Sequence, residues 1–259
     1  MRIAVASGKG GTGKTTLALA LAASYTGEVR LLDCDVEEPN CHLFLRVEAN
    51  SRIPVFSLIP ALDKSKCIEC AKCSKICAYN AIAFLGKPMI FEELCHSCGG
   101  CVRICPTGAL KEVQKEIGSL EFQKTGSINL VTGQLNVGHA MSPPLIRAVK
   151  NHISENTDTI IDCPPGTSCP MVTAVKGADY VIMVTEPTPF GLHDLKLAVE
   201  SVRQLGLRFG VVINRSDSGN DEVNDFCRTS GIPLLLEIPE RREIAEAYSR
   251  GIPLVLAIS

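Results

Sequence analysis

Short apolar segments recur along this chain and are separated by longer segments in which apolar and polar residues mix. Segments of this kind are typical of strands that are buried on both faces of a parallel sheet. We expect such strands at 2–6, 28–35, 157–162, 178–185, 209–215, 232–240 and 251–259. Helices are expected between several of them, at 16–25, 191–205 and 241–249. The alternation predicts an α/β fold with a doubly wound, mostly parallel sheet.

The pattern is weaker in two other parts of the chain. Residues 54–60 are predicted to form a short strand that leads out of the domain, and 127–131 and 134–138 are predicted as two further strands. A helix is then expected from Pro143 or Pro144 to about residue 155, because proline is tolerated in the first turn of a helix.

The composition changes between residues 61 and 113, which hold eight of the 13 cysteines. At 259 residues the chain is long enough for one large α/β domain and a small module. We expect the large domain to be discontinuous, over 1–60 and 114–259, with a small α+β module inserted over 61–113. Because no export signal precedes the first strand, metal binding is expected rather than disulfides, and 13 thiols cannot all pair within one chain.

These eight cysteines form a duplicated pattern. A Cys-x-x-Cys-x-x-Cys-x-x-x-Cys run begins at Cys67, and a second begins 28 residues later at Cys95. Zinc also binds paired Cys-x-x-Cys motifs, but zinc sites do not call for this spacing twice. The spacing resembles that of bacterial two-cluster ferredoxins, in which the fourth cysteine of each run binds the other cluster. The resemblance implies two [4Fe–4S] clusters, one held by Cys67, Cys70, Cys73 and Cys105 and one by Cys77, Cys95, Cys98 and Cys101.

A glycine-rich segment, Ser7-Gly-Lys-Gly-Gly-Thr-Gly-Lys-Thr-Thr16, connects the first strand to the first helix. Strand, glycine loop and helix are the context of a phosphate-binding loop, whose N–H groups face the phosphates. A plain tight turn is the alternative, which this context disfavours. The motif predicts Lys14 at the β- and γ-phosphates of ATP and Thr15 on Mg²⁺. The expected nucleotide contacts are Gly8, Gly10, Gly11, Thr12, Gly13, Lys14, Thr15 and Thr16.

The loop contains a second lysine, Lys9, which by itself could be a solvated surface charge. The string Lys-Gly-Gly-Thr-Gly-Lys-Thr-Thr, however, resembles the deviant Walker A loop of the MinD/ParA/Mrp family of dimeric P-loop ATPases. The resemblance implies that Lys9 reaches the nucleotide of the partner subunit. It also implies that Asp35, at the end of the second expected strand, orients the attacking water, with Asp33 as the alternative.

Further polar residues follow the later strands, and ligands of open α/β sheets bind at the carboxyl ends of strands. Asp162 occupies a Walker B position, where a carboxylate supports Mg²⁺, and its Asp-x-Pro-Pro-Gly-Thr-Ser string resembles switch II of the Mrp branch. By the same resemblance Asn214, with Arg215 beside it, contacts the adenine, although asparagine is also a common cap. Pro239 lies in an Ile-Pro-Glu sequence that resembles the loop packed on the base.

The net charge of −2 gives no indication of a nucleic-acid partner. No apolar run is long enough to span a membrane, and the C-terminal residues lack the amphipathic membrane helix of some MinD-type proteins. We therefore expect a cytoplasmic protein without a membrane anchor.

Together the two sets of motifs imply an ATPase whose nucleotide-driven dimer changes are coupled to electron transfer through two clusters. This activity would support metallocofactor or iron–sulfur cluster assembly, and it requires an ATP-dependent homodimer and a redox or cofactor-assembly protein as partner. An ATP-dependent cluster carrier of the Mrp type is the main alternative, although no Cys-x-x-Cys pair follows Cys169. A MinD/ParA-like spatial-positioning ATPase is a third. Cys163 and Cys169, near switch II, are either ordinary thiols or metal ligands, by analogy with the nitrogenase iron protein.

Overall fold

The computed structural model describes residues 1–45, 47 and 50–250, which form two compact units. The first unit comprises Met1–Ile53, Leu120–Gln134 and the chain from Ile146 onward, and the second comprises Pro54–Ser119 and Leu135–Leu145. The segment 61–113, expected as an inserted module, lies within the second unit. The strand expected at 251–259 lies outside the described residues.

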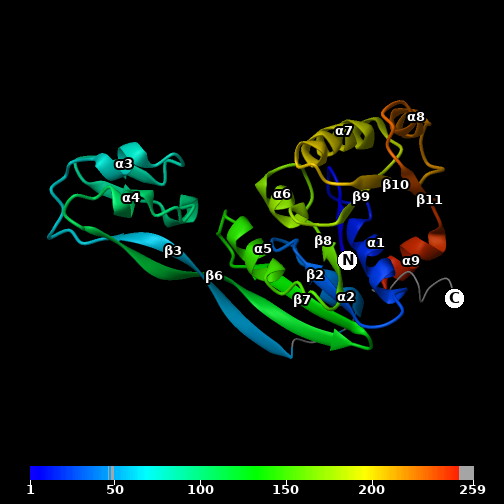
Figure 1. The fold of residues 1–259 in the computed structure, drawn as a ribbon, viewed down its shortest axis with the longest axis horizontal. Helices are drawn as coiled ribbons and strands as arrows, with labels where there is room; N and C mark the ends of the chain where they lie inside the picture. The colour runs from blue at the N-terminus through cyan, green and yellow to red at the C-terminus, as the bar shows by residue number, and fades with distance from the viewer. Residues whose placement is uncertain (46, 48–49, 251–259) are drawn as a thin grey trace. The chain divides into compact units, whose positions relative to one another are not determined.

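A nine-stranded sheet runs through the described part of the chain in the order β11-β10-β9-β1-β8-β2-β7-β6-β3 (Figure 1). Every neighbouring pair from β11 to β7 is parallel. The strands of this parallel part are β1 (Arg2–Ala6), β2 (Val29–Asp33), β7 (Ile128–Leu135), β8 (Asp158–Asp162), β9 (Tyr180–Thr185), β10 (Phe209–Asn214) and β11 (Leu234–Ile238). Parallel strands place their carboxyl ends at one edge of the sheet, so the polar residues that follow β1, β2, β8, β9 and β10 come together there.

Helices cover both faces of this sheet, as a doubly wound fold requires. They are α1 (Lys14–Ala23), α2 (Cys41–Leu45), α5 (Pro143–Lys150), α6 (Cys169–Val175), α7 (Pro189–Gln204), α8 (Glu222–Thr229) and α9 (Arg242–Ser249). Figure 1 shows α7 and α8 on one side of the strands and α1 and α9 on the other. Leu17, Leu19 and Ala22 of α1 are buried in a core with Leu31 of β2 and Leu130 of β7. Each fully buried aliphatic side chain of this size contributes about 1.5–3 kcal/mol to stability.

The second unit is small and is built around the cysteine runs. It contains α3 (Lys72–Ile76), β4 (Ile82–Phe84), β5 (Pro88–Ile90), the short 3₁₀ helix η1 (Glu92–Leu94) and α4 (Gly100–Arg103). β4 and β5 form an antiparallel hairpin, and the core contains Cys73, Cys101, Ile82 and Leu110. This core is small, and the partly buried side chains of Leu62, Ile90 and Val102 pack against it.

Two long strands connect the sheet to the second unit, and both differ from the sequence-based expectation. β3 (Ser51–Leu62) extends the strand expected at 54–60. β6 (Leu110–Thr125) was not expected, because its first half carries exposed, mostly charged residues that conceal the strand pattern. A tight turn at Gly126, with φ +53°, joins β6 to β7. Positive φ at this position favours glycine.

Two further expectations are corrected by the structure. The strands expected at 127–131 and 134–138 are one strand, β7, which continues through Gly133 and ends at Leu135. The helix expected to reach about residue 155 ends at Lys150. Residues 151–153 instead form a turn, in which the N–H groups of His152 and Ile153 donate to carbonyls three residues earlier.

Candidate functional site

The glycine loop lies between β1 and α1, as expected for a phosphate-binding loop. Gly11 and Gly13 have φ of +77° and +92°, values that only glycine adopts without strain. A Cβ atom on Gly13 would lie 2.5 Å from the Asn214 amide nitrogen, and one on Gly8 would lie 2.3 Å from the Asp194 carbonyl oxygen. The loop therefore needs glycine both for its backbone angles and for close packing. Its N–H groups and the N-terminus of α1 together form a site suited to an anion.

Three elements bring Lys14, Thr15, Asp35 and Asp162 together. Lys14 Nζ lies 3.4 Å from Asp35 Oδ2, and Thr15 Oγ1 donates to Asp162 Oδ2 at 2.6 Å. Lys14 and Thr15 begin α1, Asp35 follows β2 and Asp162 ends β8. The other carboxylate oxygen of Asp162, Oδ1, is buried and has no hydrogen-bond partner among the described residues. An unpaired buried carboxylate oxygen next to a threonine hydroxyl is a donor set that fits Mg²⁺.

The charges of this cluster are strongly perturbed by burial. Burial raises the pKa of Asp35 to about 6, against the opposing effect of Lys14. Burial also raises the pKa of Asp162, although Lys14 and the Thr15 hydrogen bond oppose it. Burial disfavours the charged form of Lys14, but Asp162 and Asp35 outweigh this and raise its pKa. The site thus holds more carboxylate than ammonium charge in a poorly solvated position, and a divalent cation would relieve that imbalance.

Asp33 has a different role from Asp35. Its Oδ1 accepts from the N–H of Asp35, and its Oδ2 accepts from the N–H groups of Asn40 and Cys41 at 3.1 Å each. Asp33 therefore shapes the loop after β2 and caps the start of α2. Burial, and then the nearby Asp162, raise its pKa. Because both oxygens of Asp33 are used by the backbone, Asp35 is the better candidate to orient a water molecule.

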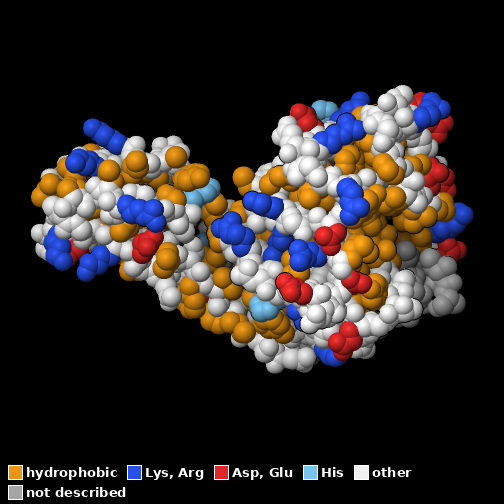
Figure 2. All heavy atoms as spheres, in the orientation of Figure 1, with side chains coloured by type: hydrophobic (Ala, Val, Ile, Leu, Met, Phe, Trp, Pro, Cys, Tyr) orange, Lys and Arg blue, Asp and Glu red, His pale blue; other side chains and the backbone are white. Residues whose placement is uncertain are grey.

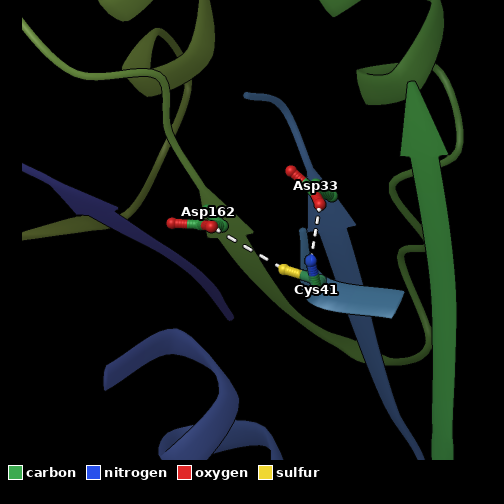
Figure 3. A group of neighbouring side chains, drawn as sticks. All are labelled: Asp33, Cys41 and Asp162. Atoms are coloured by element: carbon green, nitrogen blue, oxygen red, sulfur yellow. Dashed lines mark hydrogen bonds between the residues drawn. The ribbon is translucent and has the colours of Figure 1, made fainter. Parts of the chain in front are cut away.

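Figure 3 shows that Cys41 extends this group. Cys41 Sγ donates to Asp162 Oδ2 at 3.7 Å, and single ligand atoms of Asp33, Cys41 and Asp162 all lie within 4.8 Å of one another. All three side chains are buried. From the sequence alone Cys41 is an ordinary small apolar residue, since only the fold brings the start of α2 to the end of β8.

Lys9 is paired within its own chain. Its Nζ lies 3.2 Å from Glu186 Oε2, and Glu186 Oε1 accepts from Arg215 Nη1 at 2.9 Å. Glu186 follows β9, so its carboxylate lies at the same edge of the sheet as the phosphate-binding loop. Glu186 was not predicted as a site residue from the sequence. The available signal was an acidic residue at the carboxyl end of a buried strand, which is also where the sequence has Asp33, Asp35 and Asp162.

The residues expected at the adenine lie at the ends of neighbouring strands. Asn214 ends β10 beside Ile238 of β11, and Pro239 follows directly. The Asn214 side-chain amide donates to the Thr12 carbonyl oxygen at 2.9 Å, which ties the end of β10 to the phosphate-binding loop. Arg215 has φ of +52°, a left-handed conformation that is uncommon for a residue with a side chain.

In the second unit, the predicted ligands line two cavities. One is lined by Cys67, Cys70, Cys73 and Cys105, and the other by Cys77, Cys95, Cys98 and Cys101. Each cavity thus collects three cysteines from one run and the last cysteine of the other. The stacked rings of Tyr79 and His96, with centroids 3.5 Å apart, also line the second cavity.

The backbone around the two cavities repeats with the sequence. Glu69 and Ser97, 28 residues apart, have φ of +56° and +54°, and Ala71 and Gly99, also 28 apart, have φ of +57° and +68°. Left-handed backbone conformations at residues other than glycine are costly and concentrate at functional sites.

Burial raises the pKa of Cys101 to about 11. Burial disfavours the Cys105 thiolate, but hydrogen bonds from the backbone N–H groups of Leu110 and Thr107 outweigh it and lower the pKa of this thiol.

Cys163 and Cys169, the two cysteines in the segment that follows Asp162, differ in environment. Cys163 is fully buried directly after β8, whereas Cys169 is exposed at the start of α6, and both are free thiols. Burial strongly raises the pKa of Cys163, which keeps this thiol protonated.

In the described part of the chain, no helix has the length and apolar character needed to cross a membrane.

Comparison with known proteins gives a consistent picture of the fold. A sequence model of the CobQ/CobB/MinD/ParA nucleotide binding domain matches residues 3–254. An uncharacterized protein of Methanocaldococcus jannaschii is 32% identical over 93% of this chain and 87% of its own length. An iron–sulfur cluster carrier protein of Pyrococcus abyssi is 25% identical over 98% of this chain and 79% of its own. Among solved structures, septum site-determining protein MinD with Mg-ADP from Pyrococcus horikoshii aligns with a TM-score of 0.58 and 22% identity, covering 99% and 88% of the two chains.

Proposed function

Because the chain belongs to the CobQ/CobB/MinD/ParA nucleotide-binding family, we propose that it binds ATP with Mg²⁺ and hydrolyses it as a dimer. The glycine loop and Lys14 bind the phosphates, and Thr15 with Asp162 holds Mg²⁺, which neutralises phosphate charge when bound. The contact between Thr15 and Asp162 and the unpaired Asp162 oxygen support this assignment.

Asp35 orients the attacking water in this proposal. Its carboxylate lies 3.4 Å from Lys14 Nζ. The phosphates of ATP compete for the same lysine, so Asp35 becomes free to accept a hydrogen bond from water. Asp33 is engaged by three backbone N–H groups and keeps the loop that carries Asp35 in place. Lys9 reaches the phosphates of the partner subunit and stabilises the charge that develops there.

We further propose that the second unit binds two [4Fe–4S] clusters. The grouping of the eight cysteines carries this proposal, because each cavity collects the ligand set implied by the ferredoxin-type spacing. Four thiolates give each cluster a net negative charge. Lys72, Lys75 and Arg103 are exposed near the cysteines and offset that charge, and Figure 2 shows several separate basic side chains on the visible face of this unit.

The function that joins both sites is nucleotide-gated electron transfer. ATP-driven changes in the dimer control electron flow through the clusters to a redox or cofactor-assembly partner, in support of metallocofactor or iron–sulfur cluster assembly. Two long strands, β3 and β6, support this coupling because each continues from the sheet into the second unit.

A cluster carrier is the second candidate, and the similarity to iron–sulfur cluster carrier proteins favours it. The cysteine pattern favours a relay, since ferredoxin-type ligand sets hold their clusters permanently and only Cys227 follows Cys169 in the sequence. A spatial-positioning ATPase is a third candidate, supported by the fold it shares with MinD.

One experiment separates the first two candidates. Anaerobically purified protein should contain about eight iron and eight sulfide per chain. It is then incubated with ATP, Mg²⁺ and an apo-protein that accepts clusters, with Lys14→Ala as the control that cannot bind ATP. If the protein is an electron relay, it keeps its iron under these conditions. If it is a carrier, the wild type releases iron to the acceptor and the Lys14→Ala variant does not. Stoichiometric zinc without sulfide would contradict both.

A further inference from the structure

Glu186 is the only acidic side chain in the described part of the chain that pairs with Lys9. The contact is 3.2 Å long, and the Glu186 side chain is only 11% exposed while that of Lys9 is 32% exposed. Ser7 Oγ also donates to the Lys9 carbonyl oxygen at 2.7 Å, which keeps the backbone of the loop in place. The lysine that is proposed to act in the partner subunit is therefore held by a carboxylate of its own chain.

Glu186 also contacts Arg215, which is expected to lie at the adenine. Its second oxygen accepts from Arg215 Nη1 at 2.9 Å, and Arg215 follows Asn214, whose amide donates to the phosphate-binding loop. Arg215 makes this contact from a left-handed backbone. Such a conformation persists only where the surroundings hold it. One carboxylate thus joins the end of β9, the end of β10 and the glycine loop.

We propose that Glu186 is a positioning residue that retains Lys9 within its own subunit until an ATP-bound partner arrives. This inference rests on the proposed function, in which Lys9 acts across the dimer. A lysine ammonium cannot pair with Glu186 and reach the partner's phosphates at the same time, so the two states exclude one another. Glu186 thereby sets how much ATP-bound partner is needed before the face-to-face dimer forms.

Arg215 makes the release of Lys9 feasible. A buried carboxylate left without a counter-ion is strongly unfavourable. When Lys9 leaves, Glu186 keeps its bond to Arg215 and remains neutralised. Glu186 thus pairs with both Lys9 and Arg215, and Arg215 Nε also lies 3.9 Å from Glu240 Oε1.

The test uses the full-length protein with both sites intact, in Mg²⁺ and a non-hydrolysable ATP analogue, and measures the monomer–dimer constant by sedimentation. Glu186→Gln removes the charge and keeps the shape. A partly exposed ion pair changes an equilibrium by roughly two- to fivefold, and each dimer breaks two such pairs. The dimer of this variant should therefore form at about tenfold lower protein concentration. Glu28→Gln, which removes an exposed ion pair with Lys124, is the matched control and should change nothing.

The Glu186→Gln substitution made in a Lys9→Ala protein tests whether its effect depends on Lys9. Adding Glu186→Gln to Lys9→Ala should leave the dimer constant unchanged, because the carboxylate then has no lysine to retain. Tightening that persists without Lys9, or no tightening in the single variant, would overturn the proposal. If Glu186→Gln does not fold, Glu186→Asp, whose shorter side chain weakens the Lys9 contact, should tighten the dimer in the same direction. A wild-type protein that never dimerises with the analogue would instead refute the proposed ATP-driven dimer itself.

Discussion

Thr15 Oγ1 donates a 2.6 Å hydrogen bond to Asp162 Oδ2, and this contact joins the start of α1 to the end of β8. The two residues are 147 positions apart, and both side chains are buried. A hydroxyl and a carboxylate in this arrangement are suited to share Mg²⁺ with ATP.

The first prediction concerns this pair. Asp162→Asn should raise the Mg²⁺ concentration needed for half-maximal ATP hydrolysis by about 10- to 100-fold. This is the usual loss of metal affinity when one contact at a metal site is removed. ATP binding measured without Mg²⁺ should change much less. ATPase rates measured against Mg²⁺ concentration would detect the shift. A rate profile identical to that of the wild type would remove Asp162 from the metal site.

The second prediction concerns the two lysines of the loop. Lys9→Ala should still bind ATP, but its rate of hydrolysis should fall by about 10³-fold or more. A cation supplied by a partner contributes a rate factor of this size in other nucleotide hydrolases. Lys14→Ala should weaken binding itself. Equilibrium binding of a fluorescent ATP analogue and steady-state ATPase rates distinguish the two variants.

Mixed dimers give a sharper form of this test. Lys9→Ala and Asp35→Ala should each be nearly inactive alone. In a mixed dimer, one site has an intact Asp35 and receives an intact Lys9 from the partner, so part of the activity should return. Heterodimers that form but remain inactive would show that Lys9 acts within its own subunit.

The third prediction concerns pH and Asp35. Because burial raises its pKa to about 6, the value of kcat/KM for ATP should fall as the pH drops through about 6. Asp35 must be ionised to orient water, so the acid limb reports its protonation. A pH profile of kcat/KM checks this, and a limb near pH 4 would indicate an unperturbed carboxyl.

The same pKa predicts an opposite effect on stability. The pKa of Asp35 is higher in the folded protein than its ordinary value of 3.8, so the folded state binds more protons between about pH 4 and 6. The free energy of unfolding therefore falls as the pH rises through this window. Asp35→Asn should remove part of that decline, as seen in thermal melts of anaerobic, nucleotide-free protein. Equal slopes for the wild type and the variant would contradict the assignment.

The fourth prediction tests how the cysteines share two clusters. Cys70→Ser and Cys105→Ser should each lose about four of eight iron atoms, and so should the double variant, because both residues serve one cluster. Cys70→Ser combined with Cys98→Ser should lose nearly all of the iron. Iron and sulfide analysis after anaerobic purification measures this, with Cys227→Ser as the control outside the cavities. Greater loss in the Cys70/Cys105 double variant than in either single one would contradict the shared site.

Local sequence was sufficient for the parts of this protein whose chemistry depends on spacing along the chain. The phosphate-binding loop is contiguous, so the backbone between β1 and α1 needs glycine where the sequence has it, at Gly11 and Gly13. The parallel core was predictable because its central strands, β1, β2 and β8, are largely buried and form apolar runs. The repeat of 28 residues likewise indicated two equivalent cysteine loops.

The tertiary structure decided the features that depend on contacts between distant residues. β6 was not expected, because an exposed strand carries charges that hide its pattern. The separate roles of Asp33 and Asp35 follow from the direction of side chains after β2, which spacing cannot reveal. Glu186 became part of the site only because parallel strands bring the ends of β9 and β10 to the glycine loop. Lys9 and Glu186 are 177 positions apart, so no local sequence pattern reveals their ion pair, and only the fold brings them together.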